Sequence, residues 1–458
     1  MTVRRGSCPI PFTVAMVGVM TVLLSYAVTV GADTMWLVAL GGAIIASRGV
    51  PGGVPFASAD TTHWVNVPVL GELTMAAANS VGSWGLVAMQ TLIVLVTLSL
   101  LAISARTLGA SDLSTSVALF LFVMGSLPVL GIVRAQSLSL PCFALVLLLL
   151  RQEYFRPTGR IWLIPPLIVL WGNLHGAVLV GVAVAGSYLV FSRARIQPRT
   201  AVGVIVVMSM GLWATPAGLR THAYYIGVLN NAAARRGEGL WAPINFSSPL
   251  DLLLVLTGTV LLGLALWGRV PMWERFAILG LVVMTVHTSR HGVWLLMLLV
   301  PYAARHLDRL FRQRRSDHRH GAARRRAVAL LVTALTAASL PGLAERSRAV
   351  GVDAETARRL ATAIGKGQPT LAPSPLAEAL ASAGVTVWAS NPIDAFPGER
   401  QDAYLDFLAD PASFRTTSAQ APERIVLRRD GTPSQFVRVH FDPTATVAGY
   451  VVYSRNGR

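Results

Sequence analysis

The sequence has little charge for its length. Of its 458 residues, 13% are charged and 53% are hydrophobic, whereas soluble domains carry about 25% charged residues. So few charges cannot cover the surface of a water-soluble protein of this size, and a disordered chain would be much less apolar. The mean hydropathy of +0.56 agrees with this. The composition therefore predicts a polytopic, mainly α-helical membrane protein.

Cysteine and lysine are nearly absent. The two cysteines, Cys8 and Cys142, exclude a disulfide scaffold, a multi-cysteine zinc site and a cysteine-ligated iron–sulfur cluster. Lysine occurs once, so 38 of the 39 basic residues are arginine, and the net charge is +17. Most of these arginines lie in short loops between apolar runs, so we expect no nucleic-acid partner. No residue pattern identifies a cofactor or a metal site.

Apolar runs long enough to cross a bilayer, which takes about 20 residues, recur up to residue 343. The run at 161–191 contains a polar turn at 171–176, which indicates a helical hairpin with two short arms. We treat the first run as an uncleaved span rather than a signal peptide. Counting the hairpin as two, the sequence predicts eleven spans, near 12–31, 84–103, 113–133, 135–150, 161–191, 201–216, 250–267, 275–287, 292–304 and 327–343.

The arginines indicate the orientation in the membrane. With the N-terminus in the cytoplasm, the predicted inner loops hold 20 arginines and the outer loops hold six, as the positive-inside rule requires. An odd number of spans then places the C-terminus outside. We therefore predict a multi-pass protein of the bacterial inner membrane, with a membrane domain over 1–344 and a long first outer loop over 32–83.

The tail, residues 345–458, has the composition of a soluble domain, with 12 acidic and 13 basic residues. Its patterns predict helices near 353–364, 375–383 and 400–409, and strands near 385–389, 424–428, 436–441 and 447–454. We expect a small extracytoplasmic α/β domain on the outer face of the membrane.

Ionisable residues near the ends of the predicted spans are costly at membrane depth and need an explanation. Guanidinium groups bind phosphate bidentately, and a carboxylate can act as a general base in transfer to a hydroxyl. Residues of these kinds on the outer side could line one cavity at the membrane boundary, suited to a lipid-linked phosphate. The candidates are Asp33, Glu72, Arg134, Asn173, His175 and Arg290.

Simpler structural roles remain open for these candidates. Asp33 could cap the helix that follows it, and His175 could cap the turn of the hairpin. Arg134 and Arg290 could extend to lipid headgroups.

Short motifs within residues 12–305 resemble a group of bacterial polytopic proteins that is similar to the GT-C superfamily of glycosyltransferases. The motifs are Asp33-Thr34-Met35-Trp36, Gly49-Val50-Pro51, Pro55-Phe56, Trp64-Val65-Asn66, Arg134-Ala135-Gln136, Trp171-Gly172-Asn173-Leu174-His175-Gly176 and Thr215-Pro216-Ala217-Gly218-Leu219. The resemblance implies a membrane glycosyltransferase that moves a sugar from a polyprenyl-phosphate donor to an extracytoplasmic acceptor. It also implies roles for the candidates: Asp33 as catalytic base, Arg134 and Arg290 as phosphate ligands, His175 and Asn173 as donor-positioning residues, and Glu72 on the acceptor side.

The sequence departs from the pattern of that group at three places. Val54 precedes Pro55-Phe56, Val67 follows Asn66, and Leu240 precedes Trp241, where the group carries polar residues. A non-catalytic subunit or lipid-binding partner in cell-envelope assembly is therefore the alternative hypothesis. A transporter is a third, and the absence of an internal repeat counts against it. No feature identifies a protein partner.

Overall fold

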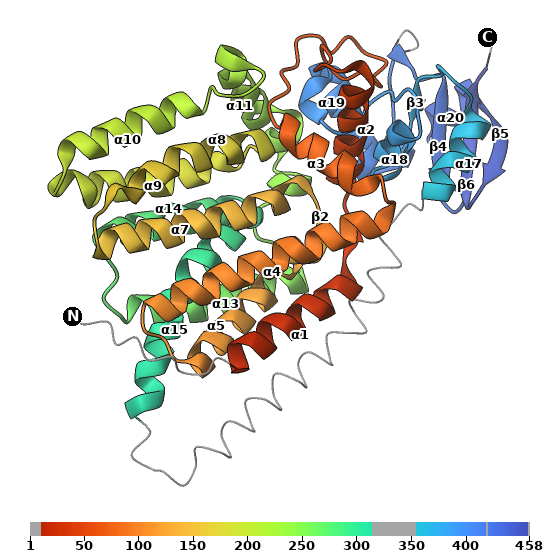
Figure 1. Cartoon of the computed structure of the whole chain (residues 1–458). Coiled ribbons are helices and arrows are strands. Elements are labelled where there is room, and N and C mark those ends of the chain that lie inside the picture. The colour runs from red at the N-terminus through yellow and green to blue at the C-terminus, as the bar shows by residue number, and fades with distance from the viewer. Residues whose placement is uncertain (1–10, 314–353, 418–419, 457–458) are drawn as a thin grey trace.

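The structure is a computed structural model and describes residues 11–313, 354–417 and 420–456. Most of the chain forms a bundle of apolar helices that run roughly side by side (Figure 1). The helices of the bundle are α1 (Pro11–Ala27), α4 (Ser83–Thr107), α5 (Asp112–Gly125), α7 (Ser139–Phe155), α8 (Ile164–Leu174), α9 (Val178–Phe191), α10 (Pro198–Gly211), α13 (Pro249–Leu266), α14 (Met272–His287) and α15 (Gly292–Gln313).

Each predicted span up to residue 304 overlaps a helix of this bundle, and the run 161–191 forms the hairpin of α8 and α9. Among the described helices, four are long and apolar enough to cross a membrane: Trp84–Thr107, Ala135–Phe155, Val178–Arg195 and Pro249–Leu266. Helices α1, α5 and α10 are apolar but shorter. The predicted span 327–343 lies outside the described residues, so the count of eleven stays a prediction.

Two ion pairs are buried inside the bundle. The guanidinium of Arg151 donates to both carboxylate oxygens of Glu274, at 3.2 and 3.1 Å, and Arg193 donates to Glu153 at 2.9 Å. Arg151 and Arg193 are among the 20 arginines counted for the predicted inner loops, yet both side chains are only 2% exposed. Each can be buried because a carboxylate from another part of the fold neutralises it.

Short helices cover one end of the bundle: α2 (Ala32–Ser47), α3 (Val69–Asn79), α6 (Leu127–Leu130), α11 (Thr221–Asn230) and α12 (Ala232–Arg236). Two glycines let α3 lie in close contact with its neighbours. A Cβ on Gly41 of α2 would lie 2.3 Å from the carbonyl oxygen of Glu72, and a Cβ on Gly71 would lie 2.2 Å from that of Leu174. Helix α3 therefore packs closely between α2 and the C-terminal end of α8.

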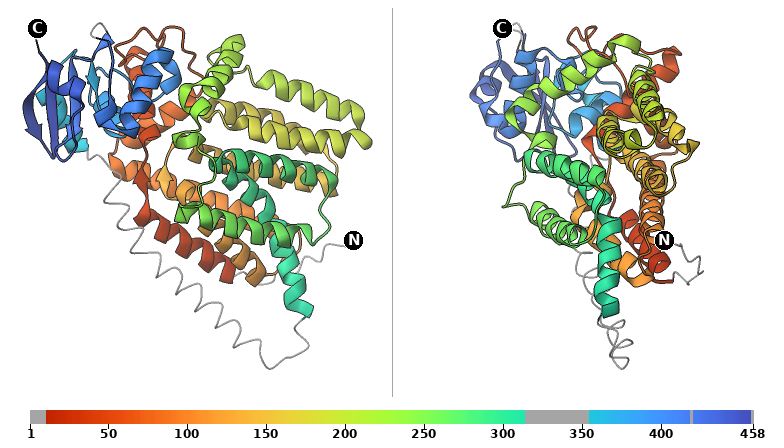
Figure 2. Two further views of the ribbon diagram at one scale, coloured as in Figure 1. Left: turned by 180° about the vertical axis from the view of Figure 1, so that it is seen from behind. Right: turned by 90° about the vertical axis from the view of Figure 1, so that its left-hand side faces the viewer.

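The C-terminal residues form a body that packs against this same end of the bundle (Figures 1 and 2). Its sheet has the order β3-β4-β6-β5, in which only the β3–β4 pair is parallel. The turn between β5 and β6 consists of Ala448 and Gly449, both with positive φ, as tight hairpins require. The elements are α17 (Ala354–Ile364), β3 (Thr370–Leu371), α18 (Leu376–Ser382), α19 (Gly398–Ala409), β4 (Arg424–Arg428), α20 (Gln435–His440), β5 (Phe441–Val447) and β6 (Tyr450–Arg455).

Several predicted elements of the tail agree with the structure, and two predicted strands do not. Residues 436–441 are not a strand but mainly helix α20, because the Ser434 hydroxyl caps it by accepting from Val437 N–H at 3.1 Å. In the predicted strand 385–389, Val387 makes only isolated bridges, to Ala57 and to Thr370.

The C-terminal body shares its hydrophobic core with the first outer loop. Leu40, Val54 and Trp64 lie in one buried cluster with C-terminal residues that include Trp388 and Phe396. A further anchor is α12, whose Arg236 forms ion pairs with two aspartates of α19. The first outer loop and the tail are therefore packed as one unit, and the domain boundary near residue 345 stays a prediction.

Candidate functional site

Asp33 and Arg134 meet at the end of the bundle because a short parallel ladder joins the segments that carry them. Strand β1 (Thr29–Val30) pairs with β2 (Ile132–Val133), and Gly31 N–H continues the ladder by donating to the carbonyl of Val133 at 3.0 Å. The first turn of α2 thus brings the Asp33 carboxylate to the Arg134 guanidinium, with Nη2 3.0 Å and Nε 3.4 Å from Oδ2.

This approach depends on glycine at position 31. A Cβ there would lie 2.9 Å from the carbonyl oxygen of Val133 and 2.9 Å from the Ile132 side chain. Gly31 is also the N-cap of α2, and no side chain makes a capping bond there. The Asp33 carboxylate therefore pairs with Arg134 and does not cap α2. Arg134 in turn pairs with Asp33 and does not extend to lipid headgroups.

His175 lies at the tip of the α8–α9 hairpin and is held through one ring nitrogen. Its Nδ1 accepts from Ala177 N–H at 3.2 Å and lies 3.0 Å from the Ser139 hydroxyl, which itself accepts from Trp171 Nε1–H at 2.7 Å. Burial, followed by the positive charge of Arg290, lowers the pKa of His175 to about 3. The ring is therefore neutral near pH 7 and, since Nδ1 is an acceptor, carries its proton on Nε2.

Arg290 lies in the short 3₁₀ helix η6 (Ser289–His291), which Gln136 tethers by donating to the Arg290 carbonyl at 3.3 Å. Its guanidinium carbon stacks 3.7 Å above the ring of Trp241. Among the described residues no carboxylate forms an ion pair with it. Burial, and then repulsion from Arg134, lower the pKa of Arg290 to about 10, so it stays charged near neutral pH.

These four residues form one electrostatic cluster. The charges of Asp33, Arg134 and Arg290 all act on His175, and those of Arg134 and Asp33 act on Arg290. The segment that begins at Arg134 brings them together, because Arg134 pairs with Asp33, Gln136 donates to the Arg290 carbonyl and Ser139 contacts His175. Two guanidinium groups therefore lie within electrostatic range of one carboxylate and one neutral imidazole. The cluster carries an excess positive charge at the end of an apolar bundle, where an anionic group could bind.

Glu72, on α3, is fully buried. Its Oε2 accepts from the Asn66 amide at 2.8 Å, while Oε1 has no hydrogen-bond partner among the described residues. Burial raises the pKa of Glu72 to about 8, against a smaller opposite effect of the Asn66 bond. The side chain is therefore mostly protonated near pH 7 and is not a proton acceptor there.

Asn173 faces a different set of partners. Its amide nitrogen donates to the carbonyls of Val169 at 2.9 Å and Ala214 at 2.8 Å. The side chain thus joins the end of α8 to the segment that follows α10, and its contact with a donor molecule stays a prediction.

Two residues at this end of the molecule were not identified from the sequence. Tyr224 of α11 lies against the hairpin tip, since a Cβ on Gly176 would lie 2.8 Å from its hydroxyl. Asp394, in the 3₁₀ helix η9 (Ile393–Ala395) of the C-terminal body, accepts from Trp64 Nε1–H at 2.9 Å. Trp64 lies in a recognisable motif, but no local pattern marks a carboxylate 330 positions away.

In the described part of the chain, no three His, Cys, Asp or Glu side chains are placed to hold a metal ion.

Comparison with known proteins finds similarity in structure only. No family model matches the sequence, and no curated protein has a significantly similar sequence. The crystal structure of ArnT from Cupriavidus metallidurans bound to undecaprenyl phosphate aligns with a TM-score of 0.55 and 13% identity, over 97% of both chains. The apo structure of the same protein aligns with a TM-score of 0.48 and 14% identity, over 96% of this chain and 97% of that one. The chain therefore has a GT-C-like fold, as its motifs predicted.

Proposed function

We propose that this protein is a glycosyltransferase of the bacterial inner membrane that moves a sugar from a polyprenyl-phosphate donor to an extracytoplasmic acceptor of the cell envelope. The observation that carries the proposal is the excess positive charge of the cluster of Arg134, Arg290, Asp33 and His175. A sugar linked to a polyprenyl phosphate is a phosphodiester with one negative charge, which would neutralise that excess. The ArnT structure, bound to undecaprenyl phosphate, supports a lipid phosphate as the ligand of this fold.

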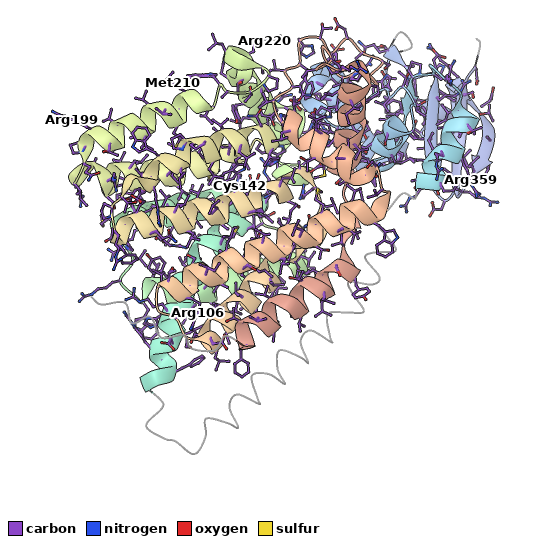
Figure 3. All side chains as sticks on the ribbon, in the orientation of Figure 1. Arg106, Cys142, Arg199, Met210, Arg220 and Arg359 are labelled. Atoms are coloured by element: carbon purple, nitrogen blue, oxygen red, sulfur yellow. The ribbon has the colours of Figure 1, made fainter. Side chains whose placement is uncertain are left out.

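The position of the cluster suits a lipid-linked substrate. It lies where the bundle meets the C-terminal body, and in Figure 3 Arg106 and Arg199 lie toward the opposite end of the bundle. By the positive-inside rule that opposite end faces the cytoplasm. We therefore place the N-terminus in the cytoplasm and residues 345–458 outside it, with the cluster at the outer boundary, where the lipid tail can stay in the bilayer.

The reaction assigns a role to each candidate except Asn173. The acceptor hydroxyl attacks the anomeric carbon, the bond from that carbon to the phosphate oxygen breaks, and Asp33 takes the hydroxyl proton. The leaving phosphate gains a second negative charge, which Arg134, Arg290 and the Nε2–H of His175 stabilise. Phosphate competes with Asp33 for the Arg134 guanidinium, so donor binding frees the carboxylate to accept the proton. Protonated Glu72 supports the acceptor side.

A non-catalytic lipid-binding subunit is the alternative. Val54 is 3% exposed and Val67 is fully buried, so two of the three positions where the resembled proteins carry polar residues are here part of the apolar core. A protein of this kind would bind polyprenyl phosphate without transferring a sugar.

The two hypotheses are separated by measuring binding and transfer on the same purified full-length protein. The donors are undecaprenyl phosphates bearing a labelled hexose, pentose or amino sugar, offered with a membrane extract as the source of acceptor. We expect Asp33→Asn to retain binding of undecaprenyl phosphate and to lose about 100-fold or more of the transfer rate, the usual contribution of a general base. Asp60→Asn, in the same outer loop but exposed, is the matched control and should transfer normally.

Each contrary result has a distinct meaning. Wild-type protein that binds undecaprenyl phosphate but transfers no sugar supports the non-catalytic alternative. Failure to bind undecaprenyl phosphate at all contradicts both hypotheses. Full activity of Asp33→Asn removes Asp33 from the role of base.

A further inference from the structure

The C-terminal body reaches the candidate site through Asp394. This residue lies in η9, and its Oδ2 accepts from Trp64 Nε1–H of the first outer loop at 2.9 Å. Trp64 is 7% exposed, and it belongs to the core that the loop shares with the C-terminal body. Asp394 is half-buried, and this buried donor holds its carboxylate in place.

Two residues of the first outer loop, Trp64 and Asn66, each donate a hydrogen bond to a carboxyl group. Trp64 donates to Asp394, and two residues later Asn66 donates to Glu72 at 2.8 Å. Glu72 is fully buried, and its Oε1 lacks a hydrogen-bond partner among the described residues. This stretch of the loop is therefore held at two points, by the bond from Trp64 to Asp394 and by the bond from Asn66 to Glu72.

Tyr224 links these two carboxyl groups to the arginine cluster. Burial raises the pKa of its phenol, the charges of Asp394 and Glu72 raise it further, and Arg290 acts in the opposite direction. A Cβ on Gly176 of the hairpin tip would lie 2.8 Å from the Tyr224 hydroxyl, and a Cβ on Gly227, in the same helix α11, would lie 3.7 Å from Asp394 Oδ2. Helix α11 therefore contacts both the hairpin tip and Asp394. The site thus has an arginine side and an acidic side, with Tyr224 between them.

We propose that Asp394 and Tyr224 form the sugar-binding side of the site, so that the C-terminal body supplies a substrate-binding residue. Sugar hydroxyls are hydrogen-bond donors and acceptors, and a carboxylate is the strongest acceptor a protein can offer them. A sugar phosphodiester has one anionic part and one hydroxyl-rich part, which match the arginine side and the acidic side. This inference rests on the proposed function and adds to it the residues that contact the sugar.

The test compares two kinds of lipid on full-length protein in nanodiscs. The probes are undecaprenyl phosphate alone and undecaprenyl phosphate bearing a hexose, a pentose or an amino sugar. Wild-type protein should bind at least one sugar-bearing lipid more tightly than undecaprenyl phosphate. Asp394→Asn, which keeps an acceptor for Trp64, should weaken that binding about tenfold, or about 1.4 kcal/mol, and leave the affinity for undecaprenyl phosphate unchanged.

Asp402→Asn is the matched control, because it makes the same change in the same body at a residue paired with Arg236. It should alter neither affinity. The inference is overturned if wild-type protein does not prefer any sugar-bearing lipid, if Asp394→Asn binds all probes like the wild type, or if it loses affinity equally for all of them. Loss of undecaprenyl phosphate binding in the wild type would instead contradict the proposed function itself.

Discussion

Replacing Arg134 with alanine should weaken binding of undecaprenyl phosphate for two separate reasons. The first is the loss of a charge-assisted hydrogen bond to phosphate, worth about 1.5–3 kcal/mol. The second is that Asp33, now 3.0 Å from its partner, would be left as an unpaired carboxylate beside the phosphate. At a separation of about 7 Å and an effective dielectric constant of about 20–40, that repulsion is about 1–2 kcal/mol. The two contributions together predict a loss of about 100- to 5000-fold in affinity.

The second contribution can be isolated with a double-mutant cycle. Asp33→Asn combined with Arg134→Ala removes the unpaired carboxylate, so the double variant should bind about tenfold more tightly than Arg134→Ala alone. Arg134→Lys should recover only part of the affinity, since a point charge lacks the bidentate fork. Equilibrium binding to protein in nanodiscs measures all of these values.

The matched control is Arg220→Ala, which removes an exposed arginine near α11 (Figure 3). It should bind undecaprenyl phosphate within about threefold of the wild type, because exposed charges contribute little at physiological salt. Three results would refute the reasoning: an unchanged affinity in Arg134→Ala, no recovery in the double variant, or an equal loss in Arg220→Ala.

Three further predictions concern stability and are measured by thermal unfolding. Glu274→Ala leaves Arg151 buried without its partner, so it should cost about 3–5 kcal/mol; a cost below about 1 kcal/mol would contradict this. The pKa of Glu72 is about 8 in the folded state and 4.5 ordinarily, so between these values the folded state keeps a proton that the unfolded state loses. The stability of the wild type therefore falls as pH rises from about 5 to 8. The melting temperature of Glu72→Gln should rise relative to that of the wild type across this range, and a difference that stays constant with pH would contradict this. Gly41→Ala forces a Cβ against α3 and should destabilise the fold by about 1–3 kcal/mol. Gly42→Ala is the matched control and should leave stability unchanged, because a Cβ there has no atom within 4 Å. Equal effects of the two variants would contradict the close packing of α2 on α3.

The helical bundle could be predicted because its physical cause is local. Each helix of the bundle lies on an apolar run, and the turn at His175 interrupts its run with polar residues. The tail was less predictable because competing local signals are similar in strength there. The alternation in residues 436–441 is typical of a strand, yet a single capping hydroxyl on Ser434 makes most of the segment helical.

The site was predicted in its residue types but not in its contacts. Asp33 and Arg134 each follow an apolar run, which placed them at the same side of the membrane, but their pairing depends on a two-residue ladder with no sequence signature. The bond from Trp64 to Asp394 joins residues 330 positions apart. Such a contact follows from the packing of the C-terminal body, and no periodicity or motif could have indicated it.

The most direct test of the account is a density map of the full-length protein with bound undecaprenyl phosphate. We predict that the phosphate oxygens lie about 3 Å from the guanidinium groups of both Arg134 and Arg290, with the lipid tail leaving toward the bilayer. In that map Asp33 should no longer hold both Nε and Nη2 of Arg134. A phosphate bound elsewhere, with the Asp33–Arg134 pair intact and Arg290 still stacked on Trp241 alone, would contradict the proposal that this cluster is the lipid-phosphate site.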